Sequence, residues 1–354
     1  MRRAVIIGSG SEIAPTRVTN GQMARIMDTS DEWIKERSGV EQRYFATPQI
    51  ATSDLGAAAA GKALAAAGVA REEVDMVVFA TMTPDHYFPG CGTLLQHKLG
   101  LRPVPCYDIR QQCSGFLYGL QLADAQIRAG LARTVLLVGA EVHIGFMPWT
   151  SQNFAYALGE SEVPPTPEEW DWNSRFRHLV VLFGDAGSAV VLRAAEDGER
   201  GVVDHELHGS GADHDKLYVP GTGSKYRPYT DPEQFRRGDH IPVMDGRFVF
   251  KMATSSMVEV ARSLLGKHGL RPEQLKLVLM HQANKRINEY CAKALGLRED
   301  QVAHNIHKYG NTTAATIPLL WDECVRDGRL QAGDLVLLVA FGAGMTWGAS
   351  LVRA

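Results

Sequence analysis

The sequence predicts an α/β fold built from two similar halves, residues 1–200 and 201–354. Short and nearly continuous apolar runs, such as residues 74–81, have the length and composition of strands that are buried on both faces of a parallel sheet. Segments with helical spacing alternate with these runs, which is typical of α/β proteins. Residues 273–280 repeat the pattern of residues 72–79, so the second half is expected to copy the first.

The composition limits the classes of function. A chain of 354 residues is long enough for a large core, and its formal net charge of -3 gives no overall reason to expect a nucleic acid or a membrane surface as a partner. No segment approaches the length of a transmembrane helix, and the apolar run near Met1 is too short for a secretion signal. The five cysteines lack CxxC spacing, which suits neither a zinc site nor a disulfide framework, so no metal site is expected and the cytoplasm is the expected location.

The first 70 residues contain a strand, a capped helix and a long helix. Residues 4–8 are expected to form the first strand, and the alanine-rich residues 54–67 are expected to form a helix that ends at Gly68. Between them, the cap-forming residues 28–30 precede a helical turn that carries Trp33, and basic side chains follow. Either this is an ordinary capped surface helix, or Trp33 and the cations form a platform for an anionic planar ligand such as a nucleotide. The local sequence favours the surface helix.

A change of pattern at Cys113 draws attention to this cysteine. Residues 107–111 have a strand-like pattern, a helical pattern follows until Gly130, and residues 133–140 have the pattern of a buried strand. A thiol in the first turn of a helix lies at the positive end of the helix dipole, which favours the thiolate and lowers the pKa. An isolated cysteine at such a place is more often part of the core, so partners elsewhere in the chain have to decide.

The middle of the chain is less regular. Residues 145–179 have no clean period and are expected to be an insertion, loop or cap. Residues 180–192 are expected to form two strands joined by a glycine-rich turn, and residues 209–241 are polar and rich in turns. A long amphipathic helix over residues 246–266 and a last strand at residues 335–339 complete the expected elements.

The repeat supplies partners for Cys113. His281 follows the apolar strand of the second half, and Asn311 lies in the loop that matches the Cys113 loop. The spacing from strand to loop is 36 residues from Val77 to Cys113 and 33 residues from Val278 to Asn311. Equivalent loops of two packed halves meet near their pseudo-dyad, so we expect a nucleophile, an imidazole and an amide donor at one site.

Residues 340–346 form a glycine-rich stretch after the final predicted strand. The backbone N–H groups of Ala343 and Cys113 are expected to form an oxyanion hole beside the reacting carbon. The alternative is a tight turn that closes the sheet and needs glycine for conformational reasons alone.

Four motifs carry a resemblance to a known family: residues 113–116 (CSGF), 281–284 (HQAN), 310–315 (GNTTAA) and 341–348 (FGAGMTWG). Together they resemble the β-ketoacyl-acyl-carrier-protein synthase III family of the thiolase superfamily, almost from end to end. The resemblance implies a five-layered α-β-α-β-α thiolase fold from two pseudo-symmetric halves, and a homodimer.

The same resemblance implies a decarboxylative Claisen condensation between an acyl-CoA and a malonyl thioester, with an acyl carrier protein as partner. Cys113 accepts the acyl group, while His281 and Asn311 hold the malonyl carbonyl and stabilise the enolate. Coenzyme A thioesters are substrates, and no cofactor is implied. The helix dipole is expected to keep Cys113 nucleophilic without His281 as its base.

Other residues are identified only through the resemblance. The residues that match its coenzyme A and pantetheine positions are Thr29, Trp33, Arg37, Phe250, Ala253 and Asn284. Phe88 matches a residue that reaches into the partner's acyl pocket, and Lys251 and Arg286 match basic residues that meet the carrier protein. The insertion obscures a further arginine for coenzyme A, for which Arg175 and Arg177 are the candidates.

Two other functions remain open at this point. One is a secondary-metabolism enzyme that uses the same cysteine to move an acyl group to an alcohol or amine, or to join two acyl chains. The other is a thiolase-fold protein that binds acyl groups without catalysis, which the presence of Cys113, His281 and Asn311 disfavours. The acyl chain length cannot be predicted, because pocket depth depends on packing.

Overall fold

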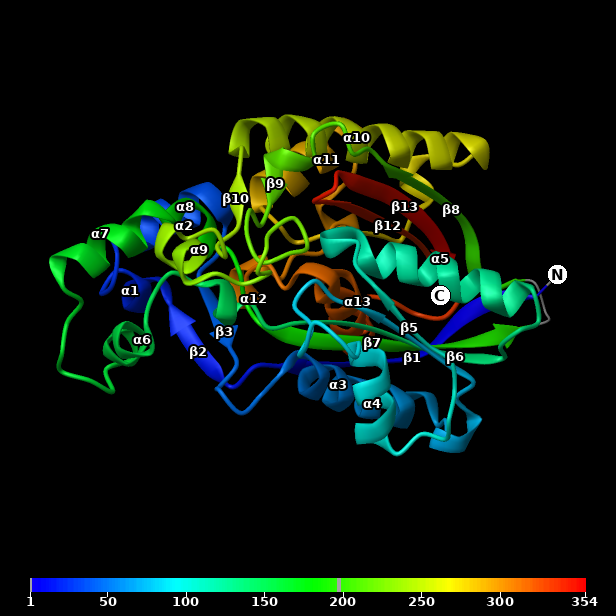
Figure 1. The fold of residues 1–354 in the computed structure, drawn as a ribbon. Helices are drawn as coiled ribbons and strands as arrows, with labels where there is room; N and C mark the ends of the chain where they lie inside the picture. Colours follow the sequence, from blue (N-terminus) through cyan, green and yellow to red (C-terminus); the bar gives the residue numbers. More distant parts are fainter. Residues whose placement is uncertain (1, 196–198) are drawn as a thin grey trace.

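The computed structural model describes residues 2–195 and 199–354, and its core is a stack of five layers (Figure 1). Two sheets lie face to face, with helices between them and on both outer faces, as Figure 1 shows from α10 at the top to α3 and α4 at the bottom. The predicted five-layered thiolase fold is therefore confirmed.

The first sheet has the strand order β1-β7-β6-β4-β5, in which β4 runs parallel to β5 and β6 while β7 runs antiparallel to β1 and β6. Its strands are β1 (Arg3–Ile13), β4 (Met76–Ala80), β5 (Cys106–Ile109), β6 (Thr134–Glu141) and β7 (Ala186–Ala195). The central strands β4 and β6 are buried along their whole length, as expected for strands covered on both faces.

The second sheet repeats this arrangement with the order β8-β13-β12-β11. Its strands are β8 (Gly201–Gly209), β11 (Leu277–Met280), β12 (Leu335–Gly342) and β13 (Thr346–Arg353). The counterpart of β5 is reduced to a single parallel bridge between Val278 and Val302. The strand directions of the two sheets correspond, which is the structural form of the repeat seen in the sequence.

The helices occupy three layers. The central pair is α5 (Gly115–Arg128) and α13 (Thr316–Arg326), which pack with both sheets in one apolar cluster. The outer helices are α3 (Thr52–Ala67) and α4 (Cys91–Leu99) on the first sheet, and α10 (Gly246–Lys267) and α11 (Lys285–Leu295) on the second. α13 is buried almost all round, from Thr316 to Cys324, as a helix between two sheets has to be.

Each central helix is preceded by a short 3-10 turn that lies against the other half of the molecule. The turn Gln112–Ser114 precedes α5 and contacts β12, and the turn Thr313–Ala315 precedes α13 and contacts β6. A Cβ on Gly342 would lie 3.0 Å from the backbone nitrogen of Cys113, so glycine permits this approach. The crossing brings the Cys113 loop and the Asn311 loop to the interface of the halves.

A lateral region at the left of Figure 1 packs around its own apolar cluster. Its helices are α1 (Asn20–Met23), α2 (Asp31–Ser38), α6 (Ser151–Leu158), α7 (Pro167–Arg175), α8 (Arg177–Val180), α9 (Pro232–Arg237) and α12 (Ile306–Tyr309). Its short strands are β2 (Thr16–Thr19) and β3 (Gln42–Phe45), which pair with each other. The short strands β9 (Leu217–Tyr218) and β10 (Val243–Met244) also pair with each other, and Leu217 packs on the apolar cluster of α10. The remaining 3-10 turns are Arg71–Glu73, Ile144–Phe146, His214–Lys216, Pro272–Gln274 and Glu299–Gln301.

Two expectations for the middle of the chain were incomplete or wrong. Residues 145–179 do form a cap, but it contains α6, α7 and most of α8, which are too short to give a visible period. Residues 180–192 do not form two strands, because only β7 is a strand and residues 182–184 instead bond through their backbone to Asn311. No helix in the described residues is long and apolar enough to span a membrane.

Candidate active site

One cavity of about 880 Å³ collects the predicted reactive residues. Cys113, His281, Asn311 and Ala343 all line it, although they come from four separate segments of the two halves. Of the residues identified by resemblance, the cavity is also lined by Trp33, Arg37, Phe250, Ala253 and Asn284. The structure thus brings the predicted chemistry and most of the predicted binding residues to one place.

Cys113 sits in the turn before α5, where Gln112 has a φ of 43° and Ser114 is fully buried. The Ser114 hydroxyl donates to the carbonyl of Thr346 at 3.0 Å, which ties this turn to the start of β13. The backbone N–H groups of Cys113 and Ala343 both interact with the thiol sulfur. Residues 343–345 form the turn between β12 and β13, so the glycine-rich stretch is a tight turn that also brings an amide to the cysteine.

The predicted lowering of the thiol pKa is wrong. The pKa of Cys113 is raised to about 12: burial is the largest cause and the buried carboxyl group of Glu141 contributes in the same direction, while the amides of Cys113 and Ala343 oppose the shift. Loss of hydration therefore outweighs the favourable position at the start of a helix. At neutral pH the group is a thiol, and a nearby proton acceptor is needed to make it a strong nucleophile.

We predict that the alkylation of Cys113 by iodoacetamide becomes faster with pH up to at least pH 9. Because the pKa of Cys113 lies far above this range, the thiolate fraction is expected to rise about tenfold for each pH unit. Mass spectrometry of the peptide that contains Cys113, at a series of pH values, gives the rate. A rate that levels off below pH 8 would show that the thiol is already ionised there.

His281 follows β11 and is almost fully buried, with 3% of its surface exposed. Its Nδ1 lies 2.7 Å from the Thr316 hydroxyl, which donates to the carbonyl of Thr313 at 3.1 Å. The contact with Thr316 fixes the orientation of the imidazole ring. Nε2 has no partner among the described residues, and burial lowers the pKa of His281 to about 3. The imidazole is therefore neutral and lies at the cavity with Nε2 available to a ligand.

Asn311 is fixed on three sides, and its amide nitrogen remains available. Its backbone N–H donates to the carbonyl of Leu182 at 2.7 Å, and its carbonyl accepts the N–H of Gly184 at 3.1 Å. Its side-chain oxygen accepts the N–H of Thr313 at 2.8 Å. The amide nitrogen has no hydrogen-bond partner among the described residues, so it can donate to a ligand.

The surroundings of Trp33 distinguish between Arg175 and Arg177, the two candidates for a further coenzyme A arginine. The guanidinium of Arg37 lies 4.5 Å from the centre of the Trp33 ring, and that of Arg177 lies 5.1 Å from it. Arg177 is held there by ion pairing and hydrogen bonding to Asp28. Arg175 instead lies over the rings of Trp172 and Phe176, so of the two candidates Arg177 is the one that joins Arg37 beside Trp33.

The other residues identified by resemblance have varied positions. Thr29 does not line the cavity, although its hydroxyl is buried without a partner among the described residues. Phe88 is 83% exposed. Lys251 and Arg286 are also exposed, and neither lines the cavity. The Asn284 side chain caps α11 and donates to the carbonyl of Arg37 at 2.9 Å, so it joins α11 to α2.

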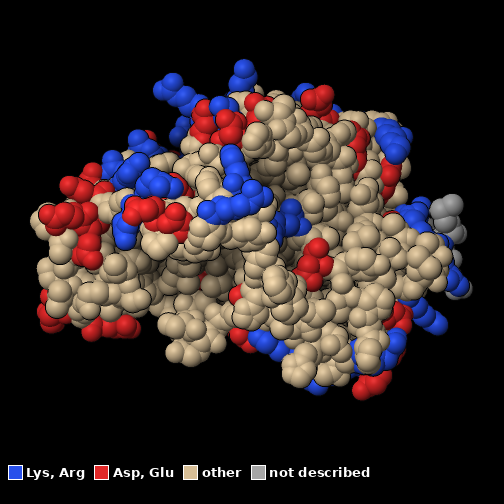
Figure 2. Space-filling view, in the orientation of Figure 1, with Lys and Arg blue, Asp and Glu red and all other residues tan. Residues whose placement is uncertain are grey.

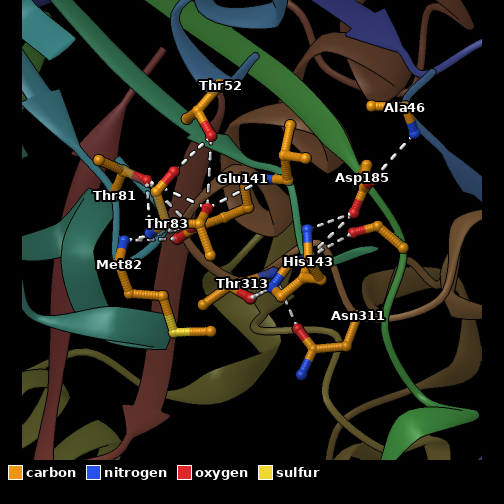
Figure 3. A network of polar contacts seen from close by, with 12 residues as sticks. Ala46, Thr52, Thr81, Met82, Thr83, Glu141, His143, Asp185, Asn311 and Thr313 are labelled. Carbon is orange, nitrogen blue, oxygen red and sulfur yellow. Dashed lines mark hydrogen bonds and ion pairs between the residues drawn. The ribbon is translucent and has the colours of Figure 1, made fainter. Parts of the chain in front are cut away.

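The residues that the sequence interpretation missed lie behind the reactive groups. Thr316 orients His281, and Thr313 orients Asn311, while His143 and Asp185 lie deeper in a polar network (Figure 3). The sequence offers one signal for His143, which is its position just after the strand β6. Polar residues that follow the strands of a parallel sheet often belong to a binding or active site. The described residues contain no group of three or more His, Cys, Asp or Glu side chains placed to hold a metal ion.

Comparison with known proteins places the chain. Residues 107–161 match the family model "3-Oxoacyl-[acyl-carrier-protein (ACP)] synthase III", and residues 265–354 match that of its C-terminal part. A β-ketoacyl-[acyl-carrier-protein] synthase III of Rhodospirillum centenum is 42% identical over 355 residues, which cover 99% of each chain.

Solved structures agree with this result. The 3-oxoacyl-[acyl-carrier-protein] synthase III of Aquifex aeolicus superposes with a TM-score of 0.84 at 34% identity, over 99% of this chain and 100% of that one. The priming β-ketosynthase of the R1128 polyketide pathway gives 0.85 at 28% identity, over 99% and 96%. The chain therefore belongs to the β-ketoacyl-acyl-carrier-protein synthase III family of acyltransferases.

Proposed function

We propose that the protein condenses an acyl-CoA starter with a malonyl thioester, carried by acyl carrier protein, and releases a 3-oxoacyl thioester and carbon dioxide. The observation that carries this proposal is the arrangement of Cys113, two backbone N–H groups, His281 and Asn311 around one cavity. A nucleophile beside preorganised donors is the arrangement that acyl transfer requires.

In the first half-reaction Cys113 becomes acylated. The lone pair of His281 Nε2 takes the thiol proton, and the sulfur attacks the carbonyl carbon of the acyl-CoA. The negative oxygen that forms is stabilised by the N–H groups of Cys113 and Ala343. The C–S bond to coenzyme A then breaks, the departing sulfur takes the proton from His281, and coenzyme A leaves as its thiol, so that His281 is neutral again.

In the second half-reaction the malonyl thioester loses carbon dioxide. The neutral imidazole of His281 donates through Nε2–H, while its Nδ1 accepts from the Thr316 hydroxyl, and the amide of Asn311 donates to the same thioester carbonyl. Both donors stabilise the enolate that forms when the C–C bond to the carboxylate breaks. The enolate carbon attacks the acyl-cysteine and displaces the Cys113 thiolate. This thiolate takes a proton from the solvent, which restores the Cys113 thiol.

The guanidinium groups of Arg37 and Arg177 at the Trp33 ring support a coenzyme A site at the cavity. A flat indole with Arg37 and Arg177 beside it suits an adenine ring and its phosphates. This proposal gives Arg177 the place that the resemblance assigns to a coenzyme A arginine. Phe250 and Ala253 line the cavity further along, on α10, where a pantetheine arm would pass.

We predict that Trp33→Ala and Arg177→Ala each raise the KM for acyl-CoA about tenfold, because stacking on one base contributes about 1–3 kcal/mol. The turnover number is expected to change little. Steady-state kinetics with acyl-CoA and with an acyl-pantetheine that lacks the nucleotide test this. The Arg175→Ala variant is the matched control, with an unchanged KM. An equal loss with acyl-pantetheine would contradict the nucleotide site.

Three surface features support a carrier protein and a second subunit as partners. Lys251 and Arg286 are exposed basic residues on α10 and α11, and other basic side chains gather over α2, α8 and α9 in Figure 2. β5 is an edge strand with an exposed tyrosine, Tyr107, and such an edge is a ready surface for another chain. The neighbouring Tyr87 and Phe88 are 63% and 83% exposed, which suits residues covered by a partner subunit.

The remaining parts of the proposal concern cofactors and location. Coenzyme A thioesters serve as substrates in this account, and no step calls for a further cofactor. All five cysteines are free thiols, as the reducing cytoplasm favours.

The test of the function is product analysis with an acyl-CoA and malonyl-carrier protein. The expected product is a 3-oxoacyl-carrier protein, formed one-to-one with carbon dioxide. The alternative is a secondary-metabolism enzyme that transfers an acyl group or joins two acyl chains, and its support is the resemblance to the priming β-ketosynthase of a polyketide pathway. A product that forms equally well without any malonyl thioester would favour that alternative.

A further inference from the structure

A buried histidine outside the proposed reaction steps lies one hydrogen bond behind the Asn311 loop (Figure 3). His143 comes two residues after β6 and is 1% exposed. Its ring stacks on Phe183, with centres 4.7 Å apart and planes at 18°. Neither the coenzyme A site nor the acyl-cysteine needs this residue, so its polar contacts call for another explanation.

The hydrogen bonds of His143 define its tautomer. Nδ1 lies 3.0 Å from the carbonyl of Gly184, which can only accept, so Nδ1 carries the proton. Nε2 therefore has the lone pair and accepts from the Thr313 hydroxyl, 2.6 Å away. Asp185 fixes the backbone of His143 by accepting its N–H at 2.6 Å, and it also accepts the N–H of Ala46 at 2.9 Å.

Thr313 is held in a conformation that its side chain disfavours. Its φ is 51°, in the left-handed region where a β-branched residue is a rare exception. Such a conformation persists only where the surroundings hold it, and it is found most often at functional sites. The hydrogen bond from Thr313 to His143 is one of these restraints, because it fixes the hydroxyl of a fully buried residue.

The contacts close a ring around Asn311. Thr313 N–H donates to the side-chain oxygen of Asn311 at 2.8 Å, and the Thr313 hydroxyl donates to His143. His143 donates to the carbonyl of Gly184, whose own N–H donates to the carbonyl of Asn311 at 3.1 Å. One continuous chain of hydrogen bonds therefore runs from the side-chain oxygen of Asn311 to its backbone carbonyl and fixes both groups. With its oxygen engaged, Asn311 can present only its N–H₂ group to the cavity.

We infer that His143 is a positioning residue for malonyl decarboxylation, which acts through Thr313 to aim the Asn311 amide at the thioester carbonyl. The inference rests on the proposed function of Asn311 as a donor to the enolate. It separates the half-reactions, because the bond between His143 and the Thr313 hydroxyl acts on the Asn311 loop and has no link to Cys113 in the described part of the chain. The link from Thr313 to His281 runs through the Thr313 backbone carbonyl and the Thr316 hydroxyl, which side-chain substitutions at His143 and Thr313 leave in place. A residue that only supported the fold would affect both half-reactions alike.

The test compares His143→Phe, Thr313→Val and Thr313→Ser in the full-length protein. His143→Phe keeps a ring against Phe183 without nitrogen atoms, and Thr313→Val removes only the hydroxyl group. Both are expected to lower the rate of malonyl decarboxylation by the acylated enzyme about 10- to 100-fold, since small errors in donor position are costly in rate. Acylation of Cys113 by acyl-CoA is expected to stay within about twofold of the wild type, and Thr313→Ser is expected to recover most of the decarboxylation rate.

Thermal unfolding of each variant is measured alongside, and Asn311→Ala serves as the reference. If Asn311→Ala loses decarboxylation while both His143→Phe and Thr313→Val keep the wild-type rate, the inference about His143 is overturned and the proposed function stands. Equal losses of acylation and decarboxylation in both variants also overturn it. If Asn311→Ala itself decarboxylates at the wild-type rate, the proposed role of Asn311 fails and the inference fails with it. Selective loss of decarboxylation in Asn311→Ala, His143→Phe and Thr313→Val supports the inference.

Discussion

Replacing Cys113 by alanine is expected to abolish covalent labelling of the protein by acyl-CoA and to lower the rate of condensation by at least about 10³-fold. Loss of a covalent nucleophile removes a whole reaction path, and such losses reach about 10⁶-fold in other enzymes. The fold is expected to survive, because the side chain loses only the sulfur at a position that is open to the cavity. Labelling with radioactive acyl-CoA and denaturing electrophoresis measure the effect.

The other four cysteines provide internal controls for this experiment. Cys91, Cys291 and Cys324 are buried, and Cys106 is partly buried outside the cavity lining. A Cys106→Ala variant is therefore expected to label as the wild type does. Acylation that persists in Cys113→Ala would contradict the assignment of the nucleophile.

Replacing Asn311 is expected to lower malonyl decarboxylation about 10²- to 10³-fold, the usual cost of removing one donor to a developing oxyanion. Asn311→Asp is the sharper variant, since it keeps the oxygen that accepts from Thr313 but replaces the donating N–H₂ with a second oxygen. Transfer of the acyl group to Cys113 is expected to continue. Release of labelled carbon dioxide from malonyl-carrier protein, measured with pre-acylated enzyme, gives the rate.

His281 offers a comparison within the same experiment. His281→Ala is expected to slow both half-reactions, because this imidazole is proposed to accept the proton of Cys113 in the first and to donate to the malonyl carbonyl in the second. Asn311→Asp is expected to slow only the second. If Cys113 in the His281→Ala variant is acylated at the wild-type rate, the role of His281 as the proton acceptor is contradicted.

The fold was predictable where burial dominates the sequence pattern. β4, β6 and β11 are fully buried, so their apolar runs stand out, and the repeat of residues 72–79 in 273–280 reflects a real correspondence of two sheets. β8 and β13 escaped prediction because β8 carries charged and polar residues on its exposed parts, and β13 begins within the glycine-rich stretch.

The candidate site was predictable in its residues but only partly in its electrostatics. Helix position favours a thiolate at Cys113, yet the local sequence contains no measure of how far the side chain is removed from water. The Glu141 carboxyl group that raises the thiol pKa comes from the end of β6, far from Cys113 in the chain. Such effects depend on packing, which a single sequence does not display.

The supporting residues were hidden for a similar reason. Residues 182–184 have the composition of a strand, but their backbone bonds to Asn311 across the interface of the halves. His143 and Thr313 are 170 residues apart in the chain and meet only because the turn before α13 lies against β6. Sequence spacing predicts which loops meet, whereas the hydrogen bonds between them require the structure.

The central claim is that one acyl group on Cys113 is discharged by a malonyl thioester with loss of carbon dioxide. The most direct measurement is mass analysis of the Cys113 peptide after incubation with acyl-CoA and again after addition of malonyl-carrier protein, with carbon dioxide counted in parallel. The account predicts one acyl group on Cys113 that disappears one-to-one with carbon dioxide release. An acyl group on any other residue, or carbon dioxide released while Cys113 stays acylated, would contradict it.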